Sequence, residues 1–121
     1  MIKMENGKYK YFDKHGVEIT EGCKIEASVN NSVLFSDVSA EIGAQIDYSV
    51  VMRNVRIEPG AKVKYAIIAD DAIIESGATV GAAPEDYTDG RWGIAVIGQG
   101  AVVKSGQKVK PYEMLAPFES R

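Results

Sequence analysis

Imidazole chemistry is narrowly limited in this sequence, because His15 is its only histidine. A single histidine can serve as a general base. It cannot supply the three imidazoles that hold zinc in histidine-rich catalytic sites. His15 stands in a turn-like segment at residues 13–16, ahead of the patterned part of the chain. We therefore expect neither a catalytic residue nor a metal site here.

Thiol and carboxylate chemistry are weakly indicated as well. Cys23 is the only cysteine, so it cannot form an internal disulfide. A nucleophilic thiol needs an activating base or positive charge beside it, and none is evident around Cys23. The adjacent carboxylates at residues 70–71 and 85–86 fall at predicted turns, where solvated corners are expected.

The glycine-rich segment at residues 93–100 does not predict a nucleotide-binding loop. Gln99 stands where a phosphate-binding loop needs lysine, and the following residues are typical of a strand rather than of a helix. We interpret Gly93, Gly98 and Gly100 as corner residues. Nearby, Trp92 follows Arg91 in a polar stretch, and its packing on a neighbouring face or on a partner both remain open.

Length and charge set the outer limits. The 121 residues are enough for one compact domain. With 14 basic and 17 acidic residues, the net charge of -3 shows no electrostatic footprint for nucleic acid or an anionic membrane. The sequence has no apolar run of transmembrane length and no signal-type leader. These features predict a soluble, cytoplasmic protein.

The aliphatic composition favours strands. The chain has 13 valines and 12 isoleucines but only two leucines, Leu34 and Leu115. β-branched side chains lose rotamer freedom in helices and pack well on pleated sheets. We therefore expect an all-β fold with little helix.

A shift of 17 residues superimposes the sequence on itself over three copies, at residues 29–45, 46–62 and 63–79. Aliphatic positions, corner alanines and glycines repeat without a gap. An upstream half copy at residues 22–28 places Cys23 in the register of Ala40, which predicts that Cys23 is buried.

Within each copy, apolar residues six positions apart predict hexapeptide units, each one short strand and one turn. Three such units, one of them shortened by a single residue, make one triangular coil of 17 residues. This is the length of the repeat. Stacked coils form a parallel β-helix of about four to five turns, with aliphatic residues in register inside. A β-sandwich of short strands is the alternative, but the segments lack Asn-Gly hairpin turns.

The register breaks once. Residues 81–93 contain Pro84 and several turn formers, which predicts a polar loop inserted at a coil corner. The pattern then resumes up to Val109, and residues 110–121, which lack it, are expected to lie across the open end of the prism. We divide the chain into a hairpin or linker remnant at residues 1–20, the β-helix at 21–115 and a tail at 116–121 that caps the open end. In the first segment, alternation at residues 8–11 and 17–19 around a turn predicts the hairpin.

The ordered segments resemble a known family. EGCKIEASVNNSVLF at residues 21–35, IDYSVVMRNVRIEPGA at 46–61, AIIADDAIIESGATVG at 66–81 and the closing GIAVIGQGAVV with VKPYEML are similar to the C-terminal domain of bacterial ADP-glucose pyrophosphorylase, or glucose-1-phosphate adenylyltransferase. The resemblance covers residues 21–115. It implies a left-handed β-helix, a handedness that the spacing alone does not determine.

The resemblance also implies a function. In that family, ATP and glucose 1-phosphate yield ADP-glucose and pyrophosphate for glycogen synthesis, and the catalytic residues belong to an N-terminal nucleotidyltransferase domain. This chain would then be a non-catalytic oligomerisation and regulatory domain without a cofactor, inactive alone. Its expected partners are the catalytic domain, further copies of itself and a sugar-phosphate or phosphate effector. Asp70 replaces a basic effector contact of some members, which leaves Arg53 and Arg56 as candidate effector-binding residues.

Two other functions share this fold. A stand-alone hexapeptide-repeat acyltransferase would bind acyl-CoA between subunits and would need a base such as His15. An inert scaffold would only assemble with partners through its sheet faces.

Overall fold

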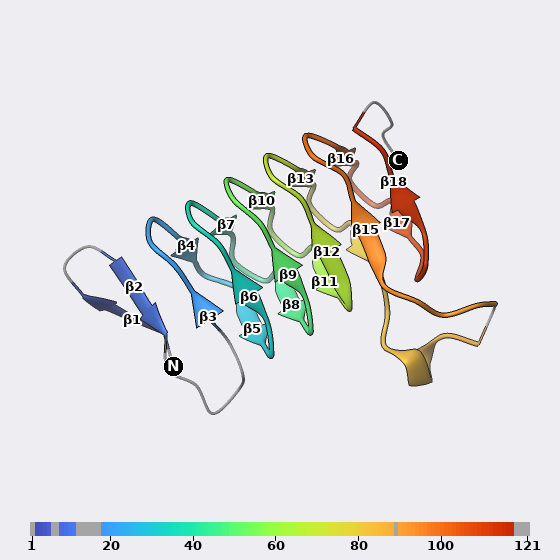
Figure 1. Cartoon of the computed structure of the whole chain (residues 1–121), viewed down its shortest axis with the longest axis horizontal. Helices are drawn as coiled ribbons and strands as arrows, with labels where there is room; N and C mark the ends of the chain where they lie inside the picture. The colour runs from blue at the N-terminus through green and yellow to red at the C-terminus, as the bar shows by residue number, and fades with distance from the viewer. Residues whose placement is uncertain (1, 6–7, 12–17, 89, 118–121) are drawn as a thin grey trace.

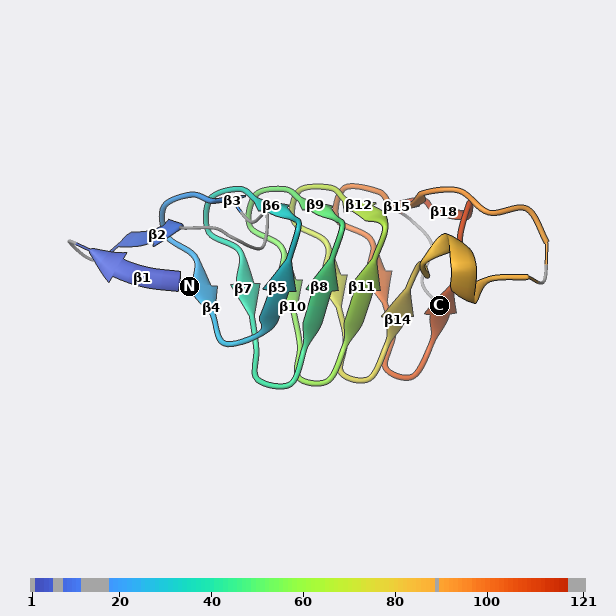
Figure 2. The same cartoon turned by 90° about the horizontal axis from the view of Figure 1, so that it is seen from below.

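The computed structural model of the chain describes residues 2–5, 8–11, 18–88 and 90–117. The described residues from 18 to 117 form a three-sided solenoid of about five turns built from three parallel sheets (Figure 1). Each coil contributes one short strand to each sheet, and the strands of successive coils stack side by side (Figure 2). The predicted β-helix is therefore confirmed, and the β-sandwich alternative is wrong.

The three sheets take every third strand of the solenoid. The β3–β18 sheet contains β3 (Glu18–Ile19), β6 (Val33–Leu34), β9 (Val50–Val51), β12 (Ala66–Ile68), β15 (Ala95–Ile97) and β18 (Met114–Leu115). The β4–β16 sheet contains β4 (Lys24–Ile25), β7 (Ser39–Ala40), β10 (Arg56–Ile57), β13 (Ile73–Ile74) and β16 (Val102–Val103). The β5–β17 sheet contains β5 (Ser28–Asn30), β8 (Gln45–Asp47), β11 (Lys62–Lys64), β14 (Thr79–Val80) and β17 (Lys108–Val109).

The predicted repeat register holds through the central coils. Ile57 pairs with Ile74, and Val63 pairs with Val80. Both isoleucines and both valines are fully buried inside the prism. Complete burial of an aliphatic side chain of this size contributes about 1.5–3 kcal/mol. The aligned aliphatic rows are thus the main source of stability.

Corner geometry explains the small residues. Ala44, Ala61 and Ala78 are buried two positions before an inward aliphatic residue, where the chain turns from one side of the prism to the next. Gly60, just before Ala61, has a φ of 76°. A non-glycine residue rarely adopts this left-handed conformation, because its Cβ crowds the backbone.

The polar insertion is confirmed between β14 and β15. Val51 pairs with Ile68 at the regular spacing of the repeat, but Ile68 pairs in turn with Ile97, much farther along the chain. The additional segment includes a short 3-10 helix, η1 (Pro84–Asp86), and projects from a corner near the C-terminal end (Figure 2). The next coil resumes in register after the loop. The loop therefore lengthens the connection between β14 and β15 but does not disturb the stacking of the coils.

The start of the solenoid differs from the prediction in one register. Ile25 pairs with Ala40, whereas Val29 pairs with Ile46, so the offset changes from 15 to 17 within the first coil. Cys23 therefore lies at the level of Val38 rather than Ala40. The corner between β4 and β5 is shorter than the equivalent corners of the later coils. A uniform 17-residue repeat does not predict this difference.

The N-terminal hairpin also differs from the predicted one. β1 (Ile2–Glu5) pairs antiparallel with β2 (Lys8–Tyr11), whereas β3 pairs in parallel with β6 as part of the solenoid. Ile19 is buried in the prism, and this burial holds β3 in the first coil. The turn predicted at residues 13–16, including His15, lies outside the described residues, as do residues 118–121 of the tail.

Candidate functional site

The three outer faces of the prism differ in chemistry. Alternation along each strand points one residue inward and its neighbours outward. On the β3–β18 sheet, the outward positions from β6 onward form two apolar rows: Val33, Val50, Ile67, Val96 and Met114 in one, and Phe35, Met52 and Ala69 in the other. We call these eight residues the apolar face. In the first coil, the polar residues Glu18 and Thr20 begin these rows. Figure 1 is viewed toward this sheet.

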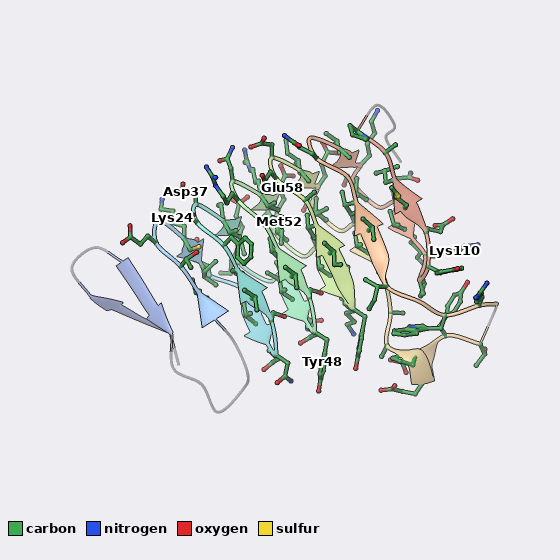
Figure 3. The ribbon with its side chains drawn as sticks, viewed as in Figure 1. Lys24, Asp37, Tyr48, Met52, Glu58 and Lys110 are labelled. Carbon is green, nitrogen blue, oxygen red and sulfur yellow. The ribbon has the colours of Figure 1, made fainter. Side chains whose placement is uncertain are left out.

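The β4–β16 sheet carries a row of carboxylates. Glu26, Glu41, Glu58 and Glu75 follow successive inward residues of this sheet. Arg56 lies among them, with its Nε atom 3.5 Å from a Glu41 carboxylate oxygen and 3.6 Å from a Glu58 carboxylate oxygen. Figure 3 shows Glu58 on one edge of the prism and Tyr48 on the opposite edge.

The β5–β17 sheet carries the basic face, which we define as Lys62, Lys64, Lys108 and Lys110. The outward row Lys62, Thr79 and Lys108 is fixed by strand pairing. One step along, Lys64, Gly81 and Lys110 occupy the equivalent positions, because Val63, Val80 and Val109 are paired. Thr79 and Gly81, which are small, thus lie between two pairs of lysines.

A cleft opens on the basic face beside the inserted loop. It has a volume of about 270 Å³, and its lining includes Thr79, Gly81, Tyr87, Lys108 and Pro111. Gly81 is held at the strand edge, since its backbone N–H donates to the Val109 carbonyl oxygen and a Cβ atom would collide with the Lys64 carbonyl oxygen. This cleft was not predicted. The repeated Lys-Val-Lys tripeptides at residues 62–64 and 108–110 were the available signal.

Arg53 and Arg56, the candidate effector residues, occupy different surroundings. Arg56 belongs to β10 and is paired with Glu41 and Glu58, so its charge is partly neutralised. Arg53 lies exposed in the turn between β9 and β10, where its backbone N–H donates to the Asp70 carboxylate at 2.9 Å. Their role as an anion contact stays a prediction.

Cys23 is buried, as predicted. Its Sγ donates to the Phe35 carbonyl oxygen at 3.0 Å, and only 2% of the residue is exposed. Burial raises the pKa of the Cys23 thiol, with a smaller contribution from the nearby charge of Asp37. A protonated, enclosed thiol is a poor nucleophile.

Three aromatic side chains, those of Tyr48, Tyr65 and Trp92, pack together at one corner of the prism. The rings of Tyr48 and Tyr65 stack with centroids 4.7 Å apart, and Trp92 meets Tyr65 edge-on at 5.6 Å. The Trp92 indole N–H donates to the Ala82 carbonyl oxygen. Trp92 therefore packs on a neighbouring face of its own chain. Desolvation, followed by the nearby Tyr48 and Glu85, raises the pKa of the Tyr65 hydroxyl.

The turn carboxylates have structural partners. Asp71 adopts a φ of 64° and accepts a hydrogen bond from the Asn54 side-chain amide, while Asp70 accepts the one from Arg53. Gly100 has a φ of 73° at a corner, which agrees with its predicted role. Among the described residues, no cluster of three or more histidine, cysteine, aspartate or glutamate side chains is suited to a metal ion.

The coil length, the aligned aliphatic rows and the alanine corners define the class: a hexapeptide-repeat β-helix. Residues 8–104 match the family model described as "GlmU-like, C-terminal hexapeptide". The chain therefore belongs to this family of left-handed β-helices. No curated protein sequence gives a significant match.

Several solved structures resemble the chain. WeeI from Acinetobacter baumannii AYE is 24% identical with a TM-score of 0.50, over 86% of this chain and 48% of that one. The acetyltransferase domain of PglB from Neisseria gonorrhoeae FA1090, in complex with acetyl coenzyme A, is 18% identical with a TM-score of 0.47, over 85% of this chain and 55% of that one. The chain thus spans about half the length of either structure, and the likeness to WeeI supports the fold.

In the part of the chain that the structure describes, no helix has both the length and the hydropathy needed to cross a bilayer.

Proposed function

We propose that this chain is a non-catalytic β-helix module that holds a nucleotidyltransferase domain in a larger sugar-nucleotide pyrophosphorylase of the ADP-glucose type. The observation that carries the proposal is the apolar face. Its eight residues carry no charge, although Glu18 pairs with Val33 at the N-terminal end of the first row, whereas the other two faces of the same prism are rich in glutamate or lysine. A continuous apolar face on one side of a charged prism is suited to contact with another protein surface.

The size of the apolar face favours a covalently linked partner. Its strands are about 4.8 Å apart and about three residues wide, which gives the sheet an area on the order of 250 Å². A stable complex between separate proteins buries about 800 Å² per partner. A tethered domain needs less contact, because the linker raises its effective concentration to the millimolar range. We therefore assign the catalytic domain of the same protein as the occupant of this face.

The resemblance of residues 21–115 to ADP-glucose pyrophosphorylase supports the particular enzyme. The family description, in which the hexapeptide segment is C-terminal, is compatible with a module that follows another domain. In this proposal the module sets domain arrangement and assembly, and nucleotidyl transfer occurs in the other domain.

Ile67→Glu tests the proposal, with Ile73→Glu as its matched control. Both isoleucines are outward residues of the prism, but Ile67 belongs to the apolar face and Ile73 to the β4–β16 sheet. In the full protein that contains this chain, Ile67→Glu should dissociate the assembly in light scattering and lower ADP-glucose synthesis, while Ile73→Glu should do neither. Unchanged size and activity with Ile67→Glu would overturn the proposal.

Acyl transfer is the second candidate function. The family's GlmU-like description and the basic cleft, which has room for part of a phosphorylated cofactor, favour it. Coenzyme A release from acetyl-CoA, measured with amino- and hydroxy-sugars, separates the two functions. The module proposal expects no release above the buffer rate. Release that Lys108→Ala abolishes would establish acyl transfer instead.

A further inference from the structure

The corner between the β5–β17 and β3–β18 sheets carries a row of large side chains. Strand pairing on the β3–β18 sheet aligns five corner positions, which we call the corner row: Asn31, Tyr48, Tyr65, Ile94 and Tyr112. Two of its rings are half exposed, Tyr48 at 52% and Tyr112 at 56%. Tyr48 lies at the edge of the apolar face, because the outward residue Val50 follows two positions later (Figure 3).

The corner row has a backbone that does not suit tyrosine. Tyr48, Tyr65 and Tyr112 have φ values of 49°, 50° and 72°, in the left-handed region that favours glycine or asparagine. Asn31 occupies the same position of the row with a φ of 46°. Bulky residues held in this region are outliers, and such strain persists mainly where it serves a function. We therefore looked for a role of the rings themselves.

One ring of the corner row already carries a guanidinium group. The Cζ atom of Arg91 lies 4.8 Å from the centroid of the Tyr112 ring, which is the geometry of a cation–π contact. Arg91 belongs to the inserted loop, so this contact joins two segments of the same chain. An exposed tyrosine ring of this corner thus accepts arginine.

Tyr48 presents the other half-exposed ring with one face open. Its first face stacks on Tyr65 at an interplanar angle of 9°, and Trp92 in turn meets Tyr65 edge-on. Among the described residues, no ring and no cation is stacked on the second face, which points toward the coil of Asn31. The stack holds the Tyr48 ring in place, so an incoming planar group meets a preformed surface.

Asp47 supplies negative charge beside the open face. It precedes Tyr48, and its Oδ1 atom accepts a hydrogen bond from the Asn30 side-chain amide at 3.0 Å. This contact holds the carboxylate toward the coil of Asn30, on the side of the open face. Lys64 is also paired with Asp47 in the strand ladder, but it belongs to the opposite coil, together with Tyr65. A planar group that carries positive charge and several N–H donors matches both the ring and the carboxylate.

We propose that the open face of Tyr48 receives an arginine side chain of the domain that covers the apolar face, with the guanidinium stacked on the ring and donating to the Asp47 carboxylate. The inference rests on the proposed function for the identity of the partner. The chemistry of the contact depends only on residues of this chain. It favours arginine over lysine, because the ammonium group is compact, strongly hydrated and not planar.

NMR of the tyrosine ring protons tests the site in the purified chain, with N-acetylarginine amide as the probe. The probe should shift the Tyr48 signals, and N-acetyllysine amide, which has the same charge, should shift them about half as much or less. Tyr112 is the internal control, because Arg91 already covers its ring. No shift at Tyr48, equal shifts at both tyrosines, or equal shifts with both probes would overturn the proposal.

Phenylglyoxal, which modifies accessible arginines, tests the contact in the full protein that contains this chain. In Tyr48→Leu, one arginine outside this chain should react about threefold to thirtyfold faster than in the wild type, which is the range of a cation–π contact. Tyr48→Phe retains the ring and should retain the protection. Tyr112→Leu, with nearly the same exposure at the substituted position, should retain it as well. Circular dichroism checks the fold of each variant.

The outcomes separate this inference from the proposed function. If Ile67→Glu disrupts the assembly while Tyr48→Leu exposes no arginine, the contact at Tyr48 is wrong and the proposed function stands. Equal loss of protection in Tyr48→Leu and Tyr112→Leu would also contradict the contact. If Ile67→Glu changes nothing, the proposed function fails, and the arginine probe still decides whether Tyr48 binds a guanidinium group.

Discussion

Two buried serines show how single hydroxyl groups complete the corners of this prism. Ser49 donates its hydroxyl to the Asp47 carbonyl oxygen and accepts the backbone N–H of Ala66 one coil later. Ser32 makes the same pair of contacts to Asn30 and Ser49. The hydroxyl of each serine thus connects adjacent coils where the backbone ladder alone would leave a buried N–H without an acceptor.

We predict that Ser49→Ala lowers the free energy of unfolding by about 1–3 kcal/mol, because it leaves the Ala66 N–H buried and unpaired. Urea denaturation measures the change. Ser76→Ala is the control: its hydroxyl bonds to Pro59, but the residue is exposed and water can replace it, so a loss below about 0.5 kcal/mol is expected. Equal losses at both serines would show that the Ser49 contact is not special.

Cys23 should give the stability a pH dependence in alkaline solution. Its pKa in the folded protein is raised by burial, so the folded state holds the thiol proton more tightly than the unfolded state. This contribution is complete below the ordinary thiol pKa of about 8.5 and is lost as pH rises through the higher folded value.

Between about pH 8 and 10, the wild-type chain should therefore lose more stability than Cys23→Ala, as measured by urea denaturation at each pH. A thiol reagent should modify the native chain far more slowly than the unfolded one. Rapid native modification at neutral pH would contradict the enclosed position of the thiol.

Among the structural elements, the turn after β14 is sterically constrained at Gly81. Gly81 and Gly106 have nearly equal φ values of 73° and 74°, but their surroundings differ. A Cβ at Gly81 would collide with the Lys64 carbonyl oxygen, whereas a Cβ at Gly106 would meet nothing within 4 Å. Alanine substitutions at the two glycines therefore distinguish the cost of the left-handed backbone conformation from the cost of steric crowding.

Gly106→Ala should cost about 1–2 kcal/mol, because an L-residue is strained in the left-handed conformation. Gly81→Ala should cost a further amount of about 1–3 kcal/mol, because the β11–β14 contact must open to admit the methyl group. Thermal and urea unfolding of the two variants measure the difference. Equal costs would mean that the Lys64 backbone shifts freely.

For the molecule as a whole, the inserted loop is an addition to a complete stack. We predict that replacing residues 82–94 with one asparagine preserves the β-helix. This change restores the regular offset between β12 and β15, and asparagine tolerates the left-handed conformation of the equivalent Tyr48 and Tyr65. The far-ultraviolet circular dichroism and cooperative unfolding should be retained. Loss of cooperative unfolding would show that the loop is part of the core.

The repeat in the sequence determined the coil, the inward rows and the position of the insertion, because its period places aliphatic residues such as Ile57 and Ile74 in register whatever the details of the corners. It could not determine that Cys23 lies level with Val38, since the shortened first corner depends on how Ile19 and Ile25 pack inside the prism. It could not pair β1 with β2 either, because local alternation at residues 8–11 fits more than one partner strand.

The basic cleft was decided only by the tertiary structure. Lys64 and Lys110 are far apart in the sequence, and the inserted loop separates their repeats. Strand pairing places both beside Gly81, where a side chain would collide with the Lys64 backbone. A period along the chain specifies which residues share a face, but the shape between them depends on the side chains that three-dimensional stacking brings together.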